Sequence, residues 1–152
     1  MDAWIKFDGI AGSSTNKLHK NETEVLAWNW GVSEETAGDS RAGRARPHDF
    51  TFLHAYDKAS TLLARAAASG KLIKEVLLTV ARGGESQRDF FKVTLKDVLV
   101  SGVDISGDDE DLLAEVSLRP RFIGISYAET SSAGTLESPV TIGWDVASNK
   151  VT

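Results

Sequence analysis

Apolar and polar side chains alternate along most of this 152-residue chain. A period of two is typical of β-strands with one buried face, because successive side chains point to opposite sides of a sheet. Segment 24–30 shows it best, with one face formed by Leu26, Trp28 and Trp30 and the other by Val25, Ala27 and Asn29. The pattern predicts strands at residues 3–7, 24–30, 49–56, 75–82, 88–95, 98–105, 112–118, 122–127 and 140–146. Turns are predicted at residues 82–85 and 107–109.

One segment, 58–69, has helical spacing instead. Its apolar face comprises Ala59, Leu62, Leu63, Ala66 and Ala67. Asp57 is suited to cap the first turn, because its carboxylate can accept hydrogen bonds from free backbone N–H groups. Gly70 is suited to end the helix, because it tolerates left-handed dihedral angles. One helix among so many strands predicts a mainly β fold, a barrel or sandwich with the helix packed on its side.

The core is expected to take the large apolar side chains of this pattern, namely Trp28, Trp30, Phe50, Phe52, Leu62 and Leu63. Two tryptophans on one strand face bury a large apolar area. The opposite face carries Val25, Ala27 and Asn29, which are small or uncharged. A face of this kind is suited to line a shared cavity or to meet another subunit.

Length and composition favour a single domain over residues 1–152 with its own core. The chain has no cysteine, which excludes disulfides and thiolate metal sites. Its formal net charge of -5 disfavours nucleic acid as a partner. No apolar run approaches the roughly 20 residues that cross a bilayer, and the N-terminus lacks the features of a Sec signal peptide. We therefore expect a chain that folds in the cytoplasm, does not insert into membranes and, if exported, uses another route.

Patterns for catalysis are weak. Residues 124–128 (Gly-Ile-Ser-Tyr-Ala) approach a nucleophile elbow around Ser126, but the last glycine and the following helix are missing. Ser14 and Lys17 match a Ser-x-x-Lys spacing without the partner motifs of that class. Gly70-Lys71 lacks the other residues of a phosphate loop. A small hydrolase is thus a minor alternative, and we expect no enzyme activity and no cofactor.

Metal binding is also disfavoured. His48 and His54 stand six residues apart, about 20 Å along a strand, which is too far to share an ion. The acidic run Asp108, Asp109, Glu110 and Asp111 attracts cations but lacks the full calcium-loop pattern. A solvated turn is the favoured interpretation of this run.

Two segments, 11–21 and 33–47, show no periodicity. Long structureless loops are uncommon in compact domains and are often functional. The second contains a basic cluster of Arg41, Arg44 and Arg46. It is interpreted either as a solvated loop or as a contact for an acidic surface on another subunit, for which residues 108–111 are the candidate. Nucleic acid is a weaker alternative, because the whole chain is acidic.

Several motifs resemble those of the haemolysin-coregulated proteins, the Hcp tube subunits of bacterial type VI secretion. Residues 25–31 (Val-Leu-Ala-Trp-Asn-Trp-Gly) resemble the family's V-x-x-W-x-W-G signature. Residues 48–52 and 57–62 resemble its H-D-F-x-F and D-K-x-S-P-x-L segments, with Thr61 where proline is usual. Similar matches occur in order at residues 4–12, 70–71, 95–101 and 143–145. The resemblance covers nearly the whole chain.

The resemblance implies two β-sheets that close into a barrel with one flanking helix, a fold related to phage tail tubes. It implies hexameric rings that stack into a tube inside a contractile sheath, are secreted to the outside or into a target cell, and carry effector proteins in the lumen. The partners implied are other copies of the chain, effectors, and the sheath and spike or baseplate. Some members carry a toxic domain after the barrel, and none is expected here after Trp144-Asp145.

If Trp28 and Trp30 point into the core, alternation directs Asn29, with Ala27 and Val25, toward the lumen of such a ring. The segments 33–47 and 11–21 then become candidates for contacts between or within rings. A phage-type tail tube subunit and a non-catalytic binding module remain the alternatives.

Overall fold

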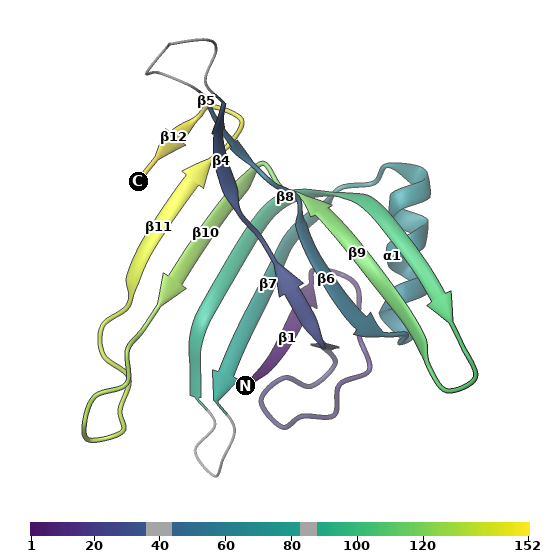
Figure 1. Cartoon of the computed structure of the whole chain (residues 1–152), viewed down its shortest axis with the longest axis horizontal. Coiled ribbons are helices and arrows are strands. Elements are labelled where there is room, and N and C mark those ends of the chain that lie inside the picture. Colours follow the sequence, from purple (N-terminus) through teal and green to yellow (C-terminus); the bar gives the residue numbers. More distant parts are fainter. Residues whose placement is uncertain (36–43, 83–87) are drawn as a thin grey trace.

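The computed structural model describes residues 1–35, 44–82 and 88–152 (Figure 1). The strands in the first half are β1 (Asp2–Phe7), β2 (Thr23–Val25), β3 (Ala27–Asn29), β4 (Val32–Glu35), β5 (Arg44–Pro47) and β6 (Phe50–Ala55). Those in the second half are β7 (Ile73–Arg82), β8 (Arg88–Gly107), β9 (Leu112–Arg119), β10 (Phe122–Tyr127), β11 (Val140–Asp145) and β12 (Lys150–Val151). The helix is α1 (Lys58–Ser69). The protein is therefore mainly β with one helix, as predicted.

The long strand β8 joins two antiparallel sheets. Sheet A has the order β12-β11-β10-β8-β7-β1-β2, and sheet B has the order β8-β9-β6-β3. The alternation pattern predicted two strands, at residues 88–95 and 98–105, where the structure has the single strand β8. The division falls at Asp97, whose φ of 51° is left-handed, a conformation that aspartate tolerates better than most residues. Val98 still pairs with Ile73 of β7, and from Leu99 onward the strand pairs with β9.

The core lies between the two sheets and α1. Fully buried side chains come from both sheets and from the helix: Ile5, Phe50, Phe52, Leu63, Leu78, Leu95, Leu118 and Ile123. Trp28 and Trp30 are half-buried and pack against this cluster. Trp28 stacks on Phe50 and on Phe91, at centroid distances of 5.9 and 5.5 Å. Leu62, also expected in the core, is half-buried but, unlike the two tryptophans, is not among the residues packed against this cluster, while its neighbour Leu63 is 0% exposed.

Asp57 fixes both the start of α1 and the loop before β2. Its Oδ1 accepts a hydrogen bond from the Ala59 N–H at 3.0 Å, the N-cap contact that was predicted. Its Oδ2 accepts from the Ser13 N–H at 3.1 Å and from Thr23 Oγ1 at 3.0 Å. One carboxylate thus holds three segments together.

The same loop is fastened at a second point. The His19 ring stacks on Trp4 with a centroid distance of 4.3 Å. Its Nδ1 lies 3.0 Å from Glu22 and its Nε2 lies 3.1 Å from Asp89 at the start of β8. Residues 11–21 are therefore irregular, as expected, but well anchored.

The predicted strand 24–30 is interrupted at Leu26. The piece before it, β2, pairs with β1 in sheet A, and the piece after it, β3, pairs with β6 in sheet B. Leu26 itself is 59% exposed, and its N–H donates to the Leu53 carbonyl at 2.8 Å. The face that points inward changes parity here, from Val25 to Trp28. Within the part of the chain that the structure describes, an unbroken ring of paired strands is therefore not formed, and the structure does not show the predicted barrel as closed.

The described residues of segment 33–47 include two strands, contrary to the prediction of an irregular segment. Its two ends form the antiparallel pair β4 and β5, with Val32 opposite Pro47 and Glu35 opposite Arg44. This two-stranded arm projects beyond the sheets at one end of the molecule (Figure 1). Arg41 and the predicted turn at residues 83–85 lie outside the described residues.

None of the helices in the described ranges has the length and apolar character needed to cross a membrane.

Candidate functional site

One face of sheet B packs on the core and the other is uncovered. Strand alternation puts Phe50, Phe52 and His54 of β6 inside, and Thr51 and Leu53 outside. The strand register extends this outer face in rows across the sheet. One row contains Asn29, Thr51, Ser117 and Gly102, and the next contains Ala27, Leu53, Glu115 and Asp104. We call these two rows the open face.

Small and uncharged residues dominate the open face around β3. Ala27 and Asn29 are exposed, as alternation predicted, and Thr51 and Ser117 beside them are half-buried. Such side chains allow close approach of a partner and provide hydrogen-bonding groups. Val25 does not belong here: it is only 7% exposed and lies in the core cluster, because the parity of the strand changes at Leu26.

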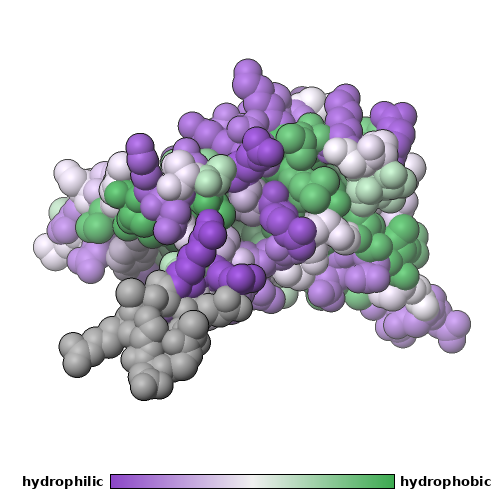
Figure 2. Space-filling model, turned by 90° about the horizontal axis from the view of Figure 1, so that it is seen from above, coloured by the Kyte–Doolittle hydropathy of each residue, from purple (hydrophilic) through white to green (hydrophobic). Residues whose placement is uncertain are grey.

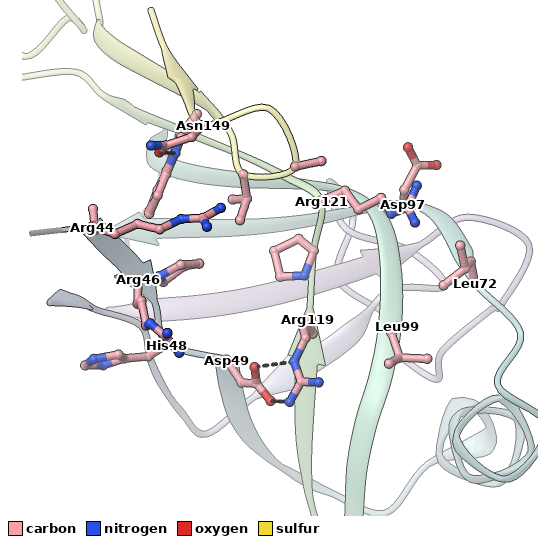
Figure 3. Close-up of a pocket in the computed structure, with 16 residues that line it drawn as sticks. Arg44, Arg46, His48, Asp49, Leu72, Asp97, Leu99, Arg119, Arg121 and Asn149 are labelled. Atoms are coloured by element: carbon pink, nitrogen blue, oxygen red, sulfur yellow. Dashed lines mark hydrogen bonds and ion pairs between the residues drawn. The ribbon is translucent and has the colours of Figure 1, made fainter. Parts of the chain in front are cut away.

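A basic groove lies at the end of sheet B that carries the arm. It has a volume of about 650 Å³ and is bordered by β5, by the turn between β9 and β10 and by the segment after β11 (Figure 3). Its charged lining consists of Arg44, Arg46, Arg119 and Arg121 against Asp49 and Asp97. Arginines outnumber aspartates in this lining, and one of them, Arg119, already pairs with Asp49. The groove is therefore suited to bind an acidic group.

Arg119 is held in place by Asp49. Its Nε donates to Oδ1 at 3.1 Å and its Nη2 donates to Oδ2 at 3.3 Å, while Ser101 Oγ donates to Oδ2 at 2.7 Å. Partial burial raises the pKa of Asp49, but the hydrogen bonds from Arg119 and Ser101 outweigh it and bring the pKa below its usual value. The same pair raises the pKa of Arg119. The guanidinium is thus oriented before any partner arrives.

Arg119 and Arg121 were not identified from the sequence. They lie more than seventy positions from Arg44 and Arg46, and only the pairing of β9 with β6 brings the two segments together. Their local signal is an arginine on each side of Pro120 in a tight turn between strands. Without the strand register that signal does not point to a shared groove.

An acidic turn lies at the opposite end of sheet B. It connects β8 to β9 and contains Asp108, Asp109, Glu110 and Asp111, all exposed. Asp108 Oδ1 accepts hydrogen bonds from the N–H groups of Glu110 at 2.8 Å and Asp111 at 2.7 Å. These bonds lower the pKa of Asp108. The turn is therefore ordered by one carboxylate and presents the others to solvent.

The register proves that the two charged ends are far apart. Phe50, which follows β5, pairs with Leu118, whereas Ala55 at the other end of β6 pairs with Leu113 beside the acidic turn. Figure 1 shows the arm and the β8–β9 turn at opposite ends of the molecule. Figure 2 looks onto the arm end and shows hydrophilic side chains near its centre, with apolar patches on either side. Sheet B is thus polar along its strands, basic at one end and acidic at the other.

A second exposed surface follows β10 and β11. The pairs Ile123–Trp144, Ile125–Ile142 and Tyr127–Val140 share one face of sheet A. The first pair is buried in the core, but Ile142, Tyr127 and Val140 extend beyond it, and Val140 is 73% exposed. β12 pairs only with Trp144 and Asp145. On the side away from β10, the start of β11 is therefore an apolar strand edge with no partner strand among the described residues.

The weak catalytic candidates do not come together. Ser126 lies inside β10, opposite Lys92 and Thr141, and not on a strand-to-helix turn. His54 is fully buried, and this burial lowers its pKa despite the opposing effect of Asp57, 4.0 Å away. His48 Nε2 lies 3.1 Å from Ser33 Oγ on the arm. Among the described residues no three acidic or histidine side chains form a cluster that could hold a metal.

Comparison with known proteins gives a consistent result. The family described as "Type VI secretion system effector, Hcp" matches residues 4–128. The chain is 34% identical to "Protein hcp1" of Pseudomonas aeruginosa, over 98% of this chain and 97% of that protein.

Solved structures agree with this result. The fold is similar to the crystal structure of Hcp1 from Salmonella typhimurium, with a TM-score of 0.84 and 30% identity over 99% of this chain and 98% of that one. It is also similar to a type VI secretion system effector from Yersinia pestis, with a TM-score of 0.79 and 30% identity over 95% of this chain and 100% of that one.

Proposed function

Because this chain belongs to the Hcp family of type VI secretion tube proteins, we propose that it closes hexameric rings, that the rings stack into a tube, and that the tube carries effector proteins in its lumen. The observation that carries this proposal is the open face: a sheet with one side in the core and the other side uncovered, small and uncharged around β3. Antiparallel sheets often leave one face in solvent, so it is the character of this face that matters: small, uncharged side chains around β3 suit the inner wall of a tube.

Ring closure requires two different contact surfaces on each subunit, because a ring is built from repeated head-to-tail contacts. Two unlike edges support this requirement. One is the apolar start of β11, with Val140 and Ile142 exposed, and the other is the segment of β2 and β3 around the exposed Leu26. Burial of apolar area at both edges would stabilise the ring by about 25 cal/mol per Å². We propose that neighbouring subunits meet along these edges.

The interruption at Leu26 also bears on whether the barrel is closed within one subunit. In each subunit the pairing passes from sheet A to sheet B through the interruption at Leu26, bridged by the bond from its N–H to the Leu53 carbonyl. We infer that this bond, with β2 and β3 as one bent strand, completes a barrel of the kind that the family implies.

Asn29 and Ala27 are proposed to face the lumen and contact cargo, and Thr51 and Ser117 are added to them by the strand register. Val25 is withdrawn from this set because it is buried. The arm with Arg44 and Arg46 is proposed to contact the next ring, and Arg41 would extend that basic surface. These roles rest on exposure and charge.

Delivery by a contractile machine defines the remaining proposed partners. The outer wall of the tube would meet the sheath, and its ends would meet the spike or baseplate. The subunits would assemble in the cytoplasm and leave the cell with the tube. We propose no catalytic role, since the chemistry belongs to the cargo, and variants of Ser126 and the three histidines that keep the fold should still deliver it.

Cysteine labelling tests the lumen assignment, since the native chain has no cysteine to interfere. An Asn29→Cys ring should react with a bulky maleimide when empty and become at least tenfold slower to react when cargo fills it. Lys58→Cys, on the exposed start of α1, is the matched control and should react equally in both states. Equal labelling of Asn29→Cys with and without cargo would contradict the proposal.

A further inference from the structure

We propose that the basic groove is the receptor for the acidic turn of a second copy of this chain in the neighbouring ring. The inference rests on the proposed tube and goes beyond it by naming the two surfaces that meet. The ligand is the β8–β9 turn with Asp109, Glu110 and Asp111, and the receptor is built by Arg44, Arg46, Arg119 and Arg121.

The groove is adapted to carboxylates. Its arginines come from β5, from the end of β9 and from the start of the segment before β10, so they surround the hollow instead of following one strand (Figure 3). Arginine presents a planar fork of donors that matches a carboxylate in two-point geometry. The Nε and Nη2 atoms of Arg119 already donate to Asp49, which fixes the guanidinium in advance and leaves its Nη1 group for a partner. A donor that is held in place before binding loses less entropy when the partner arrives.

The acidic turn is adapted to insertion. Asp108 accepts from two backbone N–H groups of its own turn, so the loop keeps one shape without a partner. The other three carboxylates stay exposed on a narrow strand end. A groove of about 650 Å³ is within the range that encloses a small ligand, so it fits the tip of a turn and not a folded domain.

A chain cannot satisfy its own groove, because the two surfaces lie at opposite ends of sheet B. A contact between one surface and a different surface of the next copy is head-to-tail, and it repeats without closing when the copies lie along one axis. Opposite charge at the two ends also disfavours head-to-head pairing, in which two acidic or two basic ends would meet. The charge distribution of one subunit thus encodes the direction of stacking.

Disulfide trapping tests the contact directly. In a chain carrying Glu110→Cys in the turn and Ala147→Cys in the groove lining, the two thiols lie at opposite ends of a subunit, so oxidation can join only different copies. We expect ladders of covalently linked subunits and lengthened stacks of rings under the electron microscope. The matched control pairs Glu110→Cys with Ala133→Cys, an exposed alanine outside the groove, and should give at least about tenfold less linked product.

Charge reversal provides the second arm. Arg44→Glu with Arg121→Glu, or Asp109→Lys with Glu110→Lys, should each lower the stacked fraction about tenfold at 0.15 M salt while single rings persist. A chain that carries both reversals should recover stacking to within about threefold. Asp108 and Arg119 are left unchanged, because they order the turn and the groove wall.

The outcomes separate this inference from the tube itself. Intact rings that stack without the trapped disulfide, or a combined reversal that does not recover, would overturn the groove assignment and leave the ring proposal standing. Failure of the native chain to form any ring would overturn both. A groove that binds duplex DNA, loses it in Arg44→Glu with Arg121→Glu and yields no disulfide would mean that its partner is a nucleic acid.

Discussion

At the scale of single residues, paired side chains decide which surfaces are preformed. Asp49 is the clearest case, since it accepts three hydrogen bonds, two from Arg119 and one from Ser101. These bonds orient a guanidinium in the groove and also tie β6 to β8 and β9. The same pair therefore contributes to stability and to the shape of the groove.

Replacing Asp49 should make the free energy of unfolding less sensitive to low pH. Because its pKa is lowered in the folded state, its contribution is present above the unfolded value of about 3.8 and disappears as pH falls through the folded value. Asp49→Asn should therefore cost about 0.5–1 kcal/mol of unfolding free energy at pH 7, a typical value for a partly exposed ion pair. The cost should diminish as the pH falls through the lowered folded-state pKa of Asp49.

Urea titrations at several pH values measure this difference. Arg119→Gln, alone and combined with Asp49→Asn, completes a double-mutant cycle that isolates the pair. A loss of unfolding free energy that does not diminish at all as the solution is acidified below pH 3.8, for as long as the native chain remains folded, would mean that the ion pair is not its source.

At the scale of elements, Asp57 matters more than an ordinary helix cap. Its carboxylate serves Ala59 in α1, and also Ser13 and Thr23 in the loop and strand before β3. Helix capping alone contributes about 1 kcal/mol. Hydrogen bonds to a charged acceptor contribute about 1.5–3 kcal/mol each.

Asp57→Ala should therefore lower the unfolding free energy by about 2–4 kcal/mol, and the loss should extend to the loop. Hydrogen exchange should show lower protection in residues 13–23 as well as in the first turn of α1. Ser60→Ala removes the hydrogen bond that Ser60 Oγ accepts from the Asp57 N–H and the one that it donates to Asp57 Oδ1. It leaves the bonds from Ser13 and Thr23 to Asp57 in place, so it should cost about 1 kcal/mol and spare the loop. Equal effects of the two substitutions on residues 13–23 would show that Asp57 acts as a cap alone.

Local sequence patterns predicted the positions of the helix and of most strands well, but not where a strand breaks or continues. The helix occupies residues 58–69 in both the prediction and the structure, because its cap, its apolar face and its final glycine all lie within a few residues of each other. The interruption at Leu26 could not be predicted. The alternation pattern assumes that the same alternate positions point into the core along the whole strand, whereas here the inward positions change where the chain passes from one sheet to the other. The length of β8 was hidden by Asp97, which resembles a turn residue but only bends the strand.

The same distinction, between features visible within one segment and features that depend on strand pairing, applies to the candidate site. Asn29 and the acidic turn were identified because each is visible within one short segment. Arg119 and Arg121 were missed because the groove depends on which strands pair. The arm was expected to be irregular because residues 33–47 show no alternation of apolar and polar side chains. Its strands nevertheless pair, from Val32 with Pro47 onward.

At the scale of the whole molecule, the two faces of sheet B and its two charged ends give each subunit a direction. One face packs on the core and the other is open, one end is basic and the other acidic. Together with the apolar edge at β11, these are the surfaces that we propose for the lumen, for the two ring neighbours and for the rings above and below.

The measurement that tests this account most directly is the number and arrangement of subunits in the purified native chain. Sedimentation equilibrium with electron microscopy should give a mass six times that of the 16.4 kDa chain and a ring with a central hole. Val140→Lys should yield folded single subunits, since a charge on the apolar edge opposes ring closure. A native chain that stays a single 16.4 kDa particle at every concentration, with no ring in any image, would contradict the account.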